Sequence, residues 1–151
     1  MHSTIVSNSS DTKWINYLKS LASASNVELE ILDMIDDTEL VKLYNQAKLV
    51  LFAPYLEPFG LVPLEAMACG TPVVGVKEGG IRETVIHQKT GLLTERDESL
   101  FAESIVKLIM NEQKIEELSQ NAIKYVNNFW TLEYSGKRLL WHLKRVLNSE
   151  N

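Results

Sequence analysis

The chain has 151 residues, a formal net charge of −5, and 45% hydrophobic and 23% charged residues. This composition is ordinary for a globular domain and excludes wholesale disorder, collagen-like repeats and disulfide scaffolds. An acidic balance argues against nucleic acid as a partner, because general nucleic-acid binding requires a basic surface. The single cysteine, Cys69, cannot form an internal disulfide, so we expect a reducing, cytoplasmic location. No apolar run approaches the ~20 residues of a membrane span, which leaves only a peripheral place at a membrane open.

The first elements in chain order are a strand and a helix. Residues 4–6 are short and β-branched, and the polar run that follows them suits a helix cap near Asp11. Apolar residues then recur at helical spacing, including Trp14, Leu18 and Leu21. The sequence therefore predicts a strand followed by a capped, amphipathic helix.

Two strands with different patterns follow. Residues 27–32 alternate apolar side chains with two glutamates, which predicts a strand that buries one face and lies at the edge of a sheet. Residues 49–53 are continuously apolar, which is typical of a central parallel strand. Between them, Asp36 and Asp37 precede a second amphipathic pattern and predict another capped helix.

Strands and helices continue to alternate in the second half of the chain. Pro63 suits the first turn of a short helix that runs to Cys69, and Gly70 suits its C-terminal cap. The further elements expected are strands over 72–76 and 90–93, a short helix over 81–86 and C-terminal helices over 98–147. This order predicts one α/β domain over 1–151, with a Rossmann-like parallel sheet and helices on both of its faces.

The loop after the apolar strand is the first place to expect a ligand, because doubly wound sheets bind ligands beyond the carboxyl ends of their strands. Gly60 allows a close approach of the backbone. The amides of Leu61 and Val62 open a helix at its positive end, which suits a phosphate. Glu57 and Glu65 lie on either side, and a carboxylate can accept two hydrogen bonds from vicinal sugar hydroxyls.

Each of these residues also has a plain alternative interpretation. Glu57 alone is equally well explained as a solvated loop charge. Glu65, expected in the first turn of the helix, would complement the helix dipole whatever its function. The order of several short motifs carries more weight than either glutamate. These motifs are EPFG at 57–60, PLEAMA at 63–68, GTPVV at 70–74, GGIRE at 79–83 and TGLL at 90–93.

This series of motifs resembles the donor-binding half of the retaining, nucleotide-sugar-dependent glycosyltransferases of family 4. Those enzymes have the two-domain GT-B architecture, and the region resembled is their C-terminal domain. The resemblance covers roughly residues 4–147 and is most specific over 40–93. The segment FWT at 129–131 is also similar to the end of that family's domain.

The resemblance implies roles for the residues of the loop. Glu57 matches the first glutamate of the family's paired-glutamate motif, which faces the donor sugar, so it is the catalytic candidate. Phe59, Gly60 and Leu61 match the loop whose backbone contacts the sugar and the diphosphate. Glu65 matches the second glutamate, which holds the ribose hydroxyls.

Three further positions follow from the same resemblance. Met34 and Ile35 lie in the turn after the predicted edge strand, where the family packs and hydrogen-bonds the nucleobase. Gly79 and Gly80 match a turn of the family, and for them a structural turn with a helix cap is at least as good an explanation as ligand contact. In the resembled family the leaving diphosphate needs no metal, so we expect no metal and no cofactor besides the donor.

The chain also departs from the family. The family's domain begins with a further strand and helix, whose loop supplies an Arg and a Lys to the diphosphate. Residues 4–6 match its second strand instead, so we expect this first β-α unit to be absent, and Ser7-Asn8-Ser9-Ser10 replaces the usual glycines. In the strand order 3-2-1-4-5-6 the absent strand lies in the middle of the sheet. We therefore expect a completing N-terminal domain, a partner, or self-association through an open sheet edge.

Three functional hypotheses remain open at this point. The first is the donor-binding part of a glycosyltransferase that moves a hexose from a nucleotide-diphosphate sugar to the hydroxyl of an unidentified acceptor, with retention. The second is a non-catalytic module that binds nucleotide sugar or packs against a partner. The third is a sugar-nucleotide epimerase. Release of nucleotide with and without an acceptor would separate the first hypothesis from the other two, and epimerisation without an acceptor would select the third.

Overall fold

The computed structural model describes residues 2–8 and 11–148, so Ser9 and Ser10, which replace the family's glycines, lie outside the described residues. The chain divides into two compact units, Met1–Leu43 and Tyr44–Asn151, and each is described by itself. Both units combine parallel strands with helices, and the predicted α/β class is confirmed.

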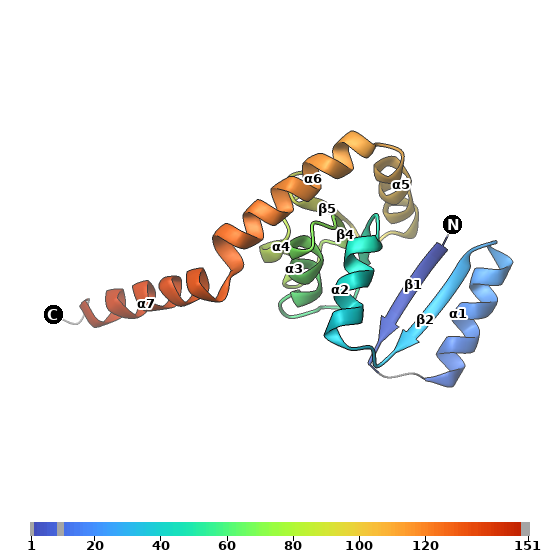
Figure 1. Ribbon diagram of the computed structural model, residues 1–151, viewed down its shortest axis with the longest axis horizontal. Helices are drawn as coiled ribbons and strands as arrows, with labels where there is room; N and C mark the ends of the chain where they lie inside the picture. Colours follow the sequence, from blue (N-terminus) through green and yellow to red (C-terminus); the bar gives the residue numbers. More distant parts are fainter. Residues whose placement is uncertain (1, 9–10, 149–151) are drawn as a thin grey trace. The chain divides into compact units, whose positions relative to one another are not determined.

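The first unit contains strand β1 (His2–Ser7), helix α1 (Thr12–Ala24) and strand β2 (Glu28–Asp33). The two strands are parallel and in register from His2 opposite Glu28 to Ser7 opposite Asp33 (Figure 1). Asp11 caps α1, because its carboxylate accepts a hydrogen bond of 2.7 Å from the amide of Lys13. Among the described residues β2 pairs with β1 alone, which confirms that it is an edge strand.

Helix α2 (Asp37–Gln46) crosses the boundary between the two units. It begins as the sequence predicts, because the carboxylate of Asp36 accepts a hydrogen bond of 2.9 Å from the amide of Glu39. Asp37 and Glu39 then place negative charge in the first turn, where the helix dipole favours it.

The second unit is built on a three-stranded parallel sheet in the order β3 (Val50–Phe52), β4 (Val73–Val76), β5 (Gly91–Thr94). The prediction that 49–53 forms a central strand is therefore wrong, since β4 is central and β3 pairs with β4 alone among the described residues. A continuous apolar run reports the faces of a strand, whereas centrality depends on hydrogen bonds along both of its edges.

The single sheet expected from the sequence is thus divided into a two-stranded and a three-stranded sheet. Among the described residues, β1 and β3 each have one edge without a partner strand.

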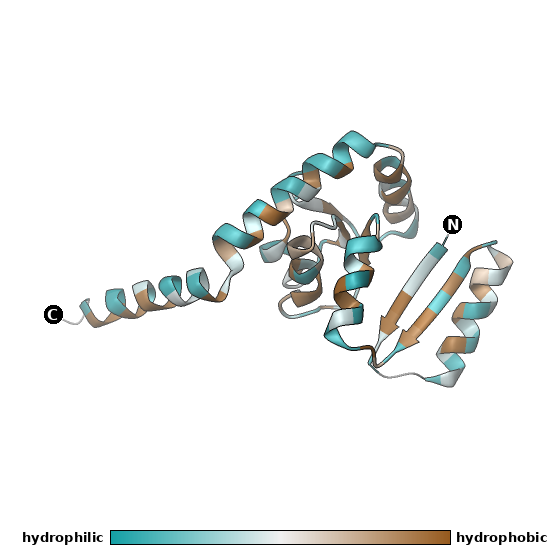
Figure 2. Ribbon diagram, in the orientation of Figure 1, coloured by the Kyte–Doolittle hydropathy of each residue, from teal (hydrophilic) through white to brown (hydrophobic). Residues whose placement is uncertain are grey.

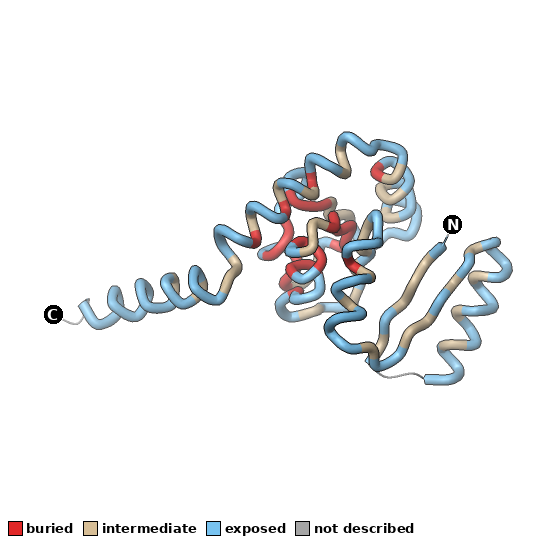
Figure 3. Tube along the Cα trace, viewed as in Figure 1, coloured by how far each residue is buried: buried red, intermediate tan, exposed pale blue. Residues whose placement is uncertain are grey.

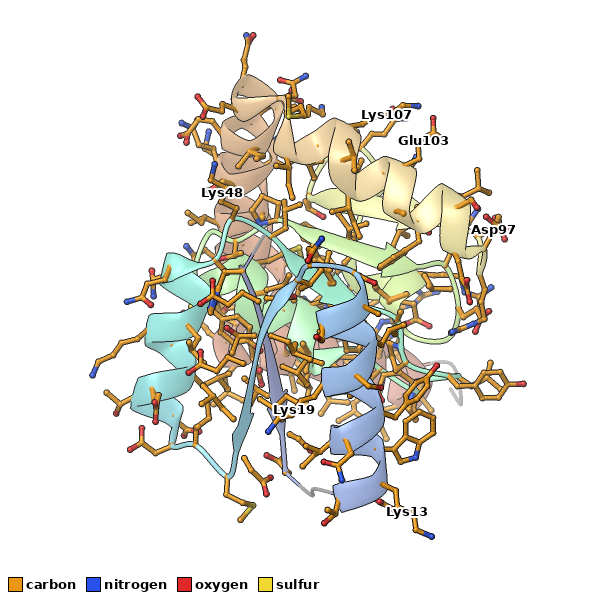
Figure 4. All side chains as sticks on the ribbon, turned by 90° about the vertical axis from the view of Figure 1, so that its right-hand side faces the viewer. Lys13, Lys19, Lys48, Asp97, Glu103 and Lys107 are labelled. Atoms are coloured by element: carbon orange, nitrogen blue, oxygen red, sulfur yellow. The ribbon has the colours of Figure 1, made fainter. Side chains whose placement is uncertain are left out.

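The helices of the second unit lie where the sequence predicts them, with small shifts at their ends. They are α3 (Leu61–Ala68), α4 (Ile81–Thr84), α5 (Glu98–Ile109), α6 (Glu112–Tyr125), the π-helical turn η1 (Val126–Trp130) and α7 (Leu132–Asn148). Asp97 caps α5 by accepting a hydrogen bond of 2.8 Å from the amide of Leu100. Further along α5, Lys107 pairs with Glu103 at 2.6 Å, and Figure 4 labels Asp97, Glu103 and Lys107.

The core of the second unit has two sides because side chains alternate along β4. On one side, Val74 packs with Leu108 of α5 and Leu118 of α6, all fully or almost fully buried. On the other side, helix α3 contacts β3 and β4 and buries Ala66 and Met67 completely. Helices therefore cover both faces of this sheet, and Figure 3 shows the buried residues gathered there.

The apolar patterns of the sequence are visible in the elements themselves. Figure 2 shows apolar residues concentrated on the strands, while α6 and α7 alternate apolar and polar residues along their length. On α7 the aliphatic residues stay exposed, from Leu132 at 91% to Leu147 at 67%. None of the helices in the described ranges is long and apolar enough to cross a membrane.

Candidate functional site

The loop that follows β3 carries the first candidate residue, Glu57, in a half-buried position. The residue before it, Leu56, has a φ of +50°, in the left-handed region that residues with a side chain rarely adopt. The backbone carbonyl of Glu57 accepts a hydrogen bond of 2.8 Å from the amide of Gly80. The loop is therefore held in an unfavourable conformation by contacts with the turn after β4.

That turn requires glycine at both of its matched positions. A Cβ at Gly79, where φ is +60°, would lie 2.2 Å from the carbonyl oxygen of Glu57. A Cβ at Gly80 would lie 2.3 Å from the Cα of Phe59. The structure thus favours a structural role for these glycines over ligand contact. Their lack of side chains lets the turn pack closely against the loop that bears Glu57.

Helix α3 begins directly after the loop. Gly60 precedes it with a φ of +93°, and a Cβ there would lie 3.0 Å from the hydroxyl of Thr84, so glycine is needed for the backbone as well. No side chain caps the first turn, so no side-chain oxygen competes with a ligand for the amides of Leu61 and Val62. This is the arrangement that favours an anion at the positive end of a helix.

Glu65 lies at the fifth position of α3, one turn into the helix. The prediction that it falls in the first turn is wrong, because the helix begins at Leu61, two residues before Pro63. No acidic residue lies in the first turn. Complementing the helix dipole, which acts over about one turn, therefore explains Glu65 less well than the sequence suggests.

Tyr44 holds the carboxylate of Glu65. The Tyr44 hydroxyl donates a hydrogen bond of 3.0 Å to Oε2 of the exposed Glu65, while the backbone carbonyl of Tyr44 accepts one from the hydroxyl of Thr71. Burial, and then the neighbouring Glu65 carboxylate, raise the pKa of the Tyr44 phenol far above its usual value. One oxygen of Glu65 is thereby oriented by the protein, while among the described residues no hydrogen bond restrains the other.

In the sequence, Tyr44 belongs to the apolar stripe of the helix that follows Asp36 and Asp37, and the pattern alone does not single it out as a site residue. The signal available was a tyrosine on that stripe, since a buried tyrosine hydroxyl needs a hydrogen-bond partner. The partner itself is 21 residues away and could not be identified from spacing.

Phe59 contacts an aromatic cluster at the end of the domain. Its ring is 40% exposed and meets the ring of Trp130 edge to face, with 5.6 Å between centroids. Tyr125 and Phe129 stack on one another in the same cluster. The segment around 129–131, singled out in the sequence, therefore packs beside the candidate loop.

The predicted site residues are divided between the two units. Six lie on the single loop–helix segment of the second unit: Glu57, Phe59, Gly60, Leu61, Val62 and Glu65. Met34 and Ile35 lie in the first unit, in the turn after β2. Met34 is 73% exposed with a φ of +54°, and its amide donates a hydrogen bond of 3.0 Å to the carbonyl of Ser7.

Metal ligation has no support in the geometry. Within residues 2–8 and 11–148, no three or more His, Cys, Asp and Glu side chains are grouped so that they could hold a metal ion. The absence of a metal from the reaction stays a prediction.

Comparison with known proteins identifies the family. Residues 11–125 match the family of glycosyl transferases group 1, and the chain belongs to this family. It is 35% identical over 102 residues to D-inositol 3-phosphate glycosyltransferase of Corynebacterium efficiens, covering 67% of this chain and 24% of that protein. It is 32% identical over 115 residues to the alpha-1,3/1,6-mannosyltransferase ALG2 of Rhizomucor pusillus, covering 76% of this chain and 25% of that protein.

A solved structure shows the same arrangement. Anabaena Alr3699/HepE in complex with UDP superimposes with a TM-score of 0.80 at 25% identity, covering 96% of this chain and 41% of that chain. The resemblance to the C-terminal domain of GT-B glycosyltransferases is therefore confirmed. The chain spans about a quarter of the length of the two curated relatives.

Proposed function

We propose that this chain binds the nucleotide-diphosphate sugar of a glycosyltransferase that transfers a hexose to an acceptor hydroxyl with retention. One observation carries the proposal, which is the pair of carboxylates on either side of the open start of α3. Glu57 lies before the helix in a strained loop, and Glu65 lies one turn inside it with one oxygen held by Tyr44.

This geometry matches the chemistry of a nucleotide sugar. Backbone amides at the positive end of a helix suit the diphosphate, while the two carboxylates suit hydroxyl groups on its two sides. We assign the ribose to Glu65, because a carboxylate fixed by Tyr44 is suited to a group that every donor shares. We assign the donor sugar to Glu57, the catalytic candidate.

Stabilisation of the leaving group lies outside this assignment, and it is commonly the largest contribution to catalysis. We therefore propose that binding of the donor resides in this chain and that transfer requires the acceptor-binding domain as well. The contact of the nucleobase with Met34 and Ile35, which the family resemblance implies, remains a separate proposal.

The test separates the two glutamates. Uridine diphosphate and UDP-glucose, present in complexes of the structural neighbours, are titrated calorimetrically into the wild-type chain and into Glu57→Ala and Glu65→Ala. Glu65→Ala should weaken both ligands, whereas Glu57→Ala should weaken only UDP-glucose. Each lost charged hydrogen-bond pair should cost about 1.5–3 kcal/mol, roughly ten- to a hundredfold in affinity.

The control is the melting temperature, which should be kept in both variants because neither carboxylate is buried. Equal losses for both ligands in both variants would remove the division of roles. If neither variant loses affinity for either ligand, Glu57 is only a charge on the loop, and Glu65 has no role in binding the donor.

A further inference from the structure

Arg96 connects the segments that follow two neighbouring strands. It lies two residues after β5, and Glu78 lies two residues after β4. The guanidinium binds the Glu78 carboxylate through both of its oxygens, with Nε 2.8 Å from Oε1 and Nη2 2.9 Å from Oε2. Such a bidentate pair fixes the orientation of the guanidinium as well as its position.

The same guanidinium also holds the beginning of the loop after β3. Nη1 donates to the carbonyl of Ala53 at 3.4 Å, and Nη2 donates to the carbonyl of Pro54 at 2.5 Å. The guanidinium carbon lies 5.6 Å from the centroid of the Tyr55 ring. One side chain therefore touches the segments that leave all three strands of this sheet.

These contacts account for the strained residue of the loop. Arg96 holds positions 53–55, and Gly80 holds the carbonyl of Glu57, so Leu56 at a φ of +50° lies between two fixed points. A residue with a side chain persists in such a conformation only when surrounding contacts determine it. Glu57 follows directly, so the direction of its side chain depends on both fixed points.

A direct role of Arg96 in binding phosphate fits the contacts less well. Four hydrogen bonds to protein acceptors occupy four of the five N–H donors of the guanidinium. Its charge already faces the Glu78 carboxylate. The guanidinium therefore uses its hydrogen bonds within the protein, as a positioning role requires.

We propose that Arg96, oriented by Glu78, is a positioning residue that sets how the loop presents Glu57 to the sugar of the donor. This rests on the proposed function for the identity of the ligand. The sequence motifs did not point to Arg96 or Glu78. Their role arises from contacts between residues that are 18 to 43 positions apart in the chain.

The test compares Arg96→Gln with a matched control, Arg145→Gln. Arg145 also stacks over an aromatic ring, that of Trp141 at 4.6 Å, but it lies on α7, which is not part of the loop. Calorimetric titration with UDP-glucose should show a loss of about tenfold in affinity for Arg96→Gln, with uridine diphosphate changed by less than about twofold. Arg145→Gln should change neither affinity.

Amide hydrogen exchange gives a readout that needs no ligand. In Arg96→Gln the amide of Gly80, which donates to the carbonyl of Glu57, should exchange about tenfold faster than in the wild-type chain, while the amides of β4 keep their protection. Glu78→Gln should reproduce the same pattern more weakly, and it should add little to Arg96→Gln because the two residues form one unit. Arg96→Lys keeps the charge without the planar fork, and it should restore the affinity for UDP-glucose only in part.

The outcomes are distinguishable. Unchanged exchange at the amide of Gly80 overturns the positioning role, and so does faster exchange there with unchanged affinity for UDP-glucose. Equal weakening of uridine diphosphate and UDP-glucose also overturns it, because the effect would then not act through Glu57. A wild-type chain that binds neither ligand overturns the proposed function and this inference with it. If Arg96→Gln does not fold, Arg96→Lys and Glu78→Gln test the proposal by the same criteria.

Discussion

The two units of the chain achieve very different burial with similar sequence patterns. In Tyr44–Asn151 the side chains of Val73, Val74 and Leu118 have no exposed surface, whereas no described residue of Met1–Leu43 is buried. Helix α1 nevertheless has a regular apolar stripe, with Leu21 51% exposed. A two-stranded sheet with one helix has too few layers to enclose a side chain, so amphipathic periodicity predicts an element but not its burial.

The largest effect should come from removing a leucine in each unit. Leu118→Ala deletes a side chain that packs between Val74 and Leu108, so it should cost about 2–5 kcal/mol of unfolding free energy. Leu21→Ala removes the same atoms from an exposed position and should cost no more than about 0.5 kcal/mol. Urea unfolding followed by far-UV circular dichroism measures both. Similar costs at the two sites would contradict the contrast between the units.

Alanine substitutions at two glycines should show how far the tight packing of the second unit extends. Gly80→Ala places a Cβ 2.3 Å from the Cα of Phe59, so the backbone must move and stability should fall by about 1–3 kcal/mol. Gly136→Ala, in α7, meets nothing within 4 Å and should gain about 0.5–1 kcal/mol from helix propensity. Melting temperatures should therefore shift in opposite directions. A lower melting temperature for Gly136→Ala would show that this position of α7 is packed against other residues.

The smallest effect concerns the one buried tyrosine hydroxyl of the site. Because burial and the Glu65 carboxylate raise the pKa of Tyr44, the folded state keeps its phenol protonated where the unfolded state begins to ionise, near pH 10. The stability associated with Tyr44 is thus fully present below about pH 10 and is lost as the pH rises above it.

Absorbance titration of the five tyrosines should show this directly. Tyr44→Phe should remove the component that ionises last, and Tyr17→Phe, which removes an exposed phenol of the first unit, controls for the loss of one chromophore. A last component that survives Tyr44→Phe would show that Glu65 does not contact this hydroxyl.

Local signals in the sequence predicted the structure well. Asp11 and Asp36 begin their helices as expected, because a cap involves residues two or three positions apart. The alternation over 27–32 predicted one exposed face, and β2 shows it, with both of its glutamates exposed. The motifs around Glu57 and Glu65 likewise lie on one loop and one helix, so their proximity follows from short spacing.

Non-local contacts could not be predicted in the same way. Residues 49–53 have the composition of a central strand, but the strand's position depends on partners along its edges. Tyr44 meets Glu65 across 21 residues, and Arg96 meets Pro54 across 42. Many residues could satisfy each of these contacts, and only the tertiary fold selects among them.

The edge-to-face contact between Phe59 and Trp130 makes the candidate loop visible to fluorescence. The chain has three tryptophans, and the other two, Trp14 and Trp141, are 63% and 53% exposed. Replacing both by phenylalanine leaves Trp130 as the sole indole, in contact with the rings of Phe59, Tyr125 and Phe129. A displacement of Phe59 then changes the intensity and wavelength of the Trp130 emission, so the protein carries its own optical probe of the loop.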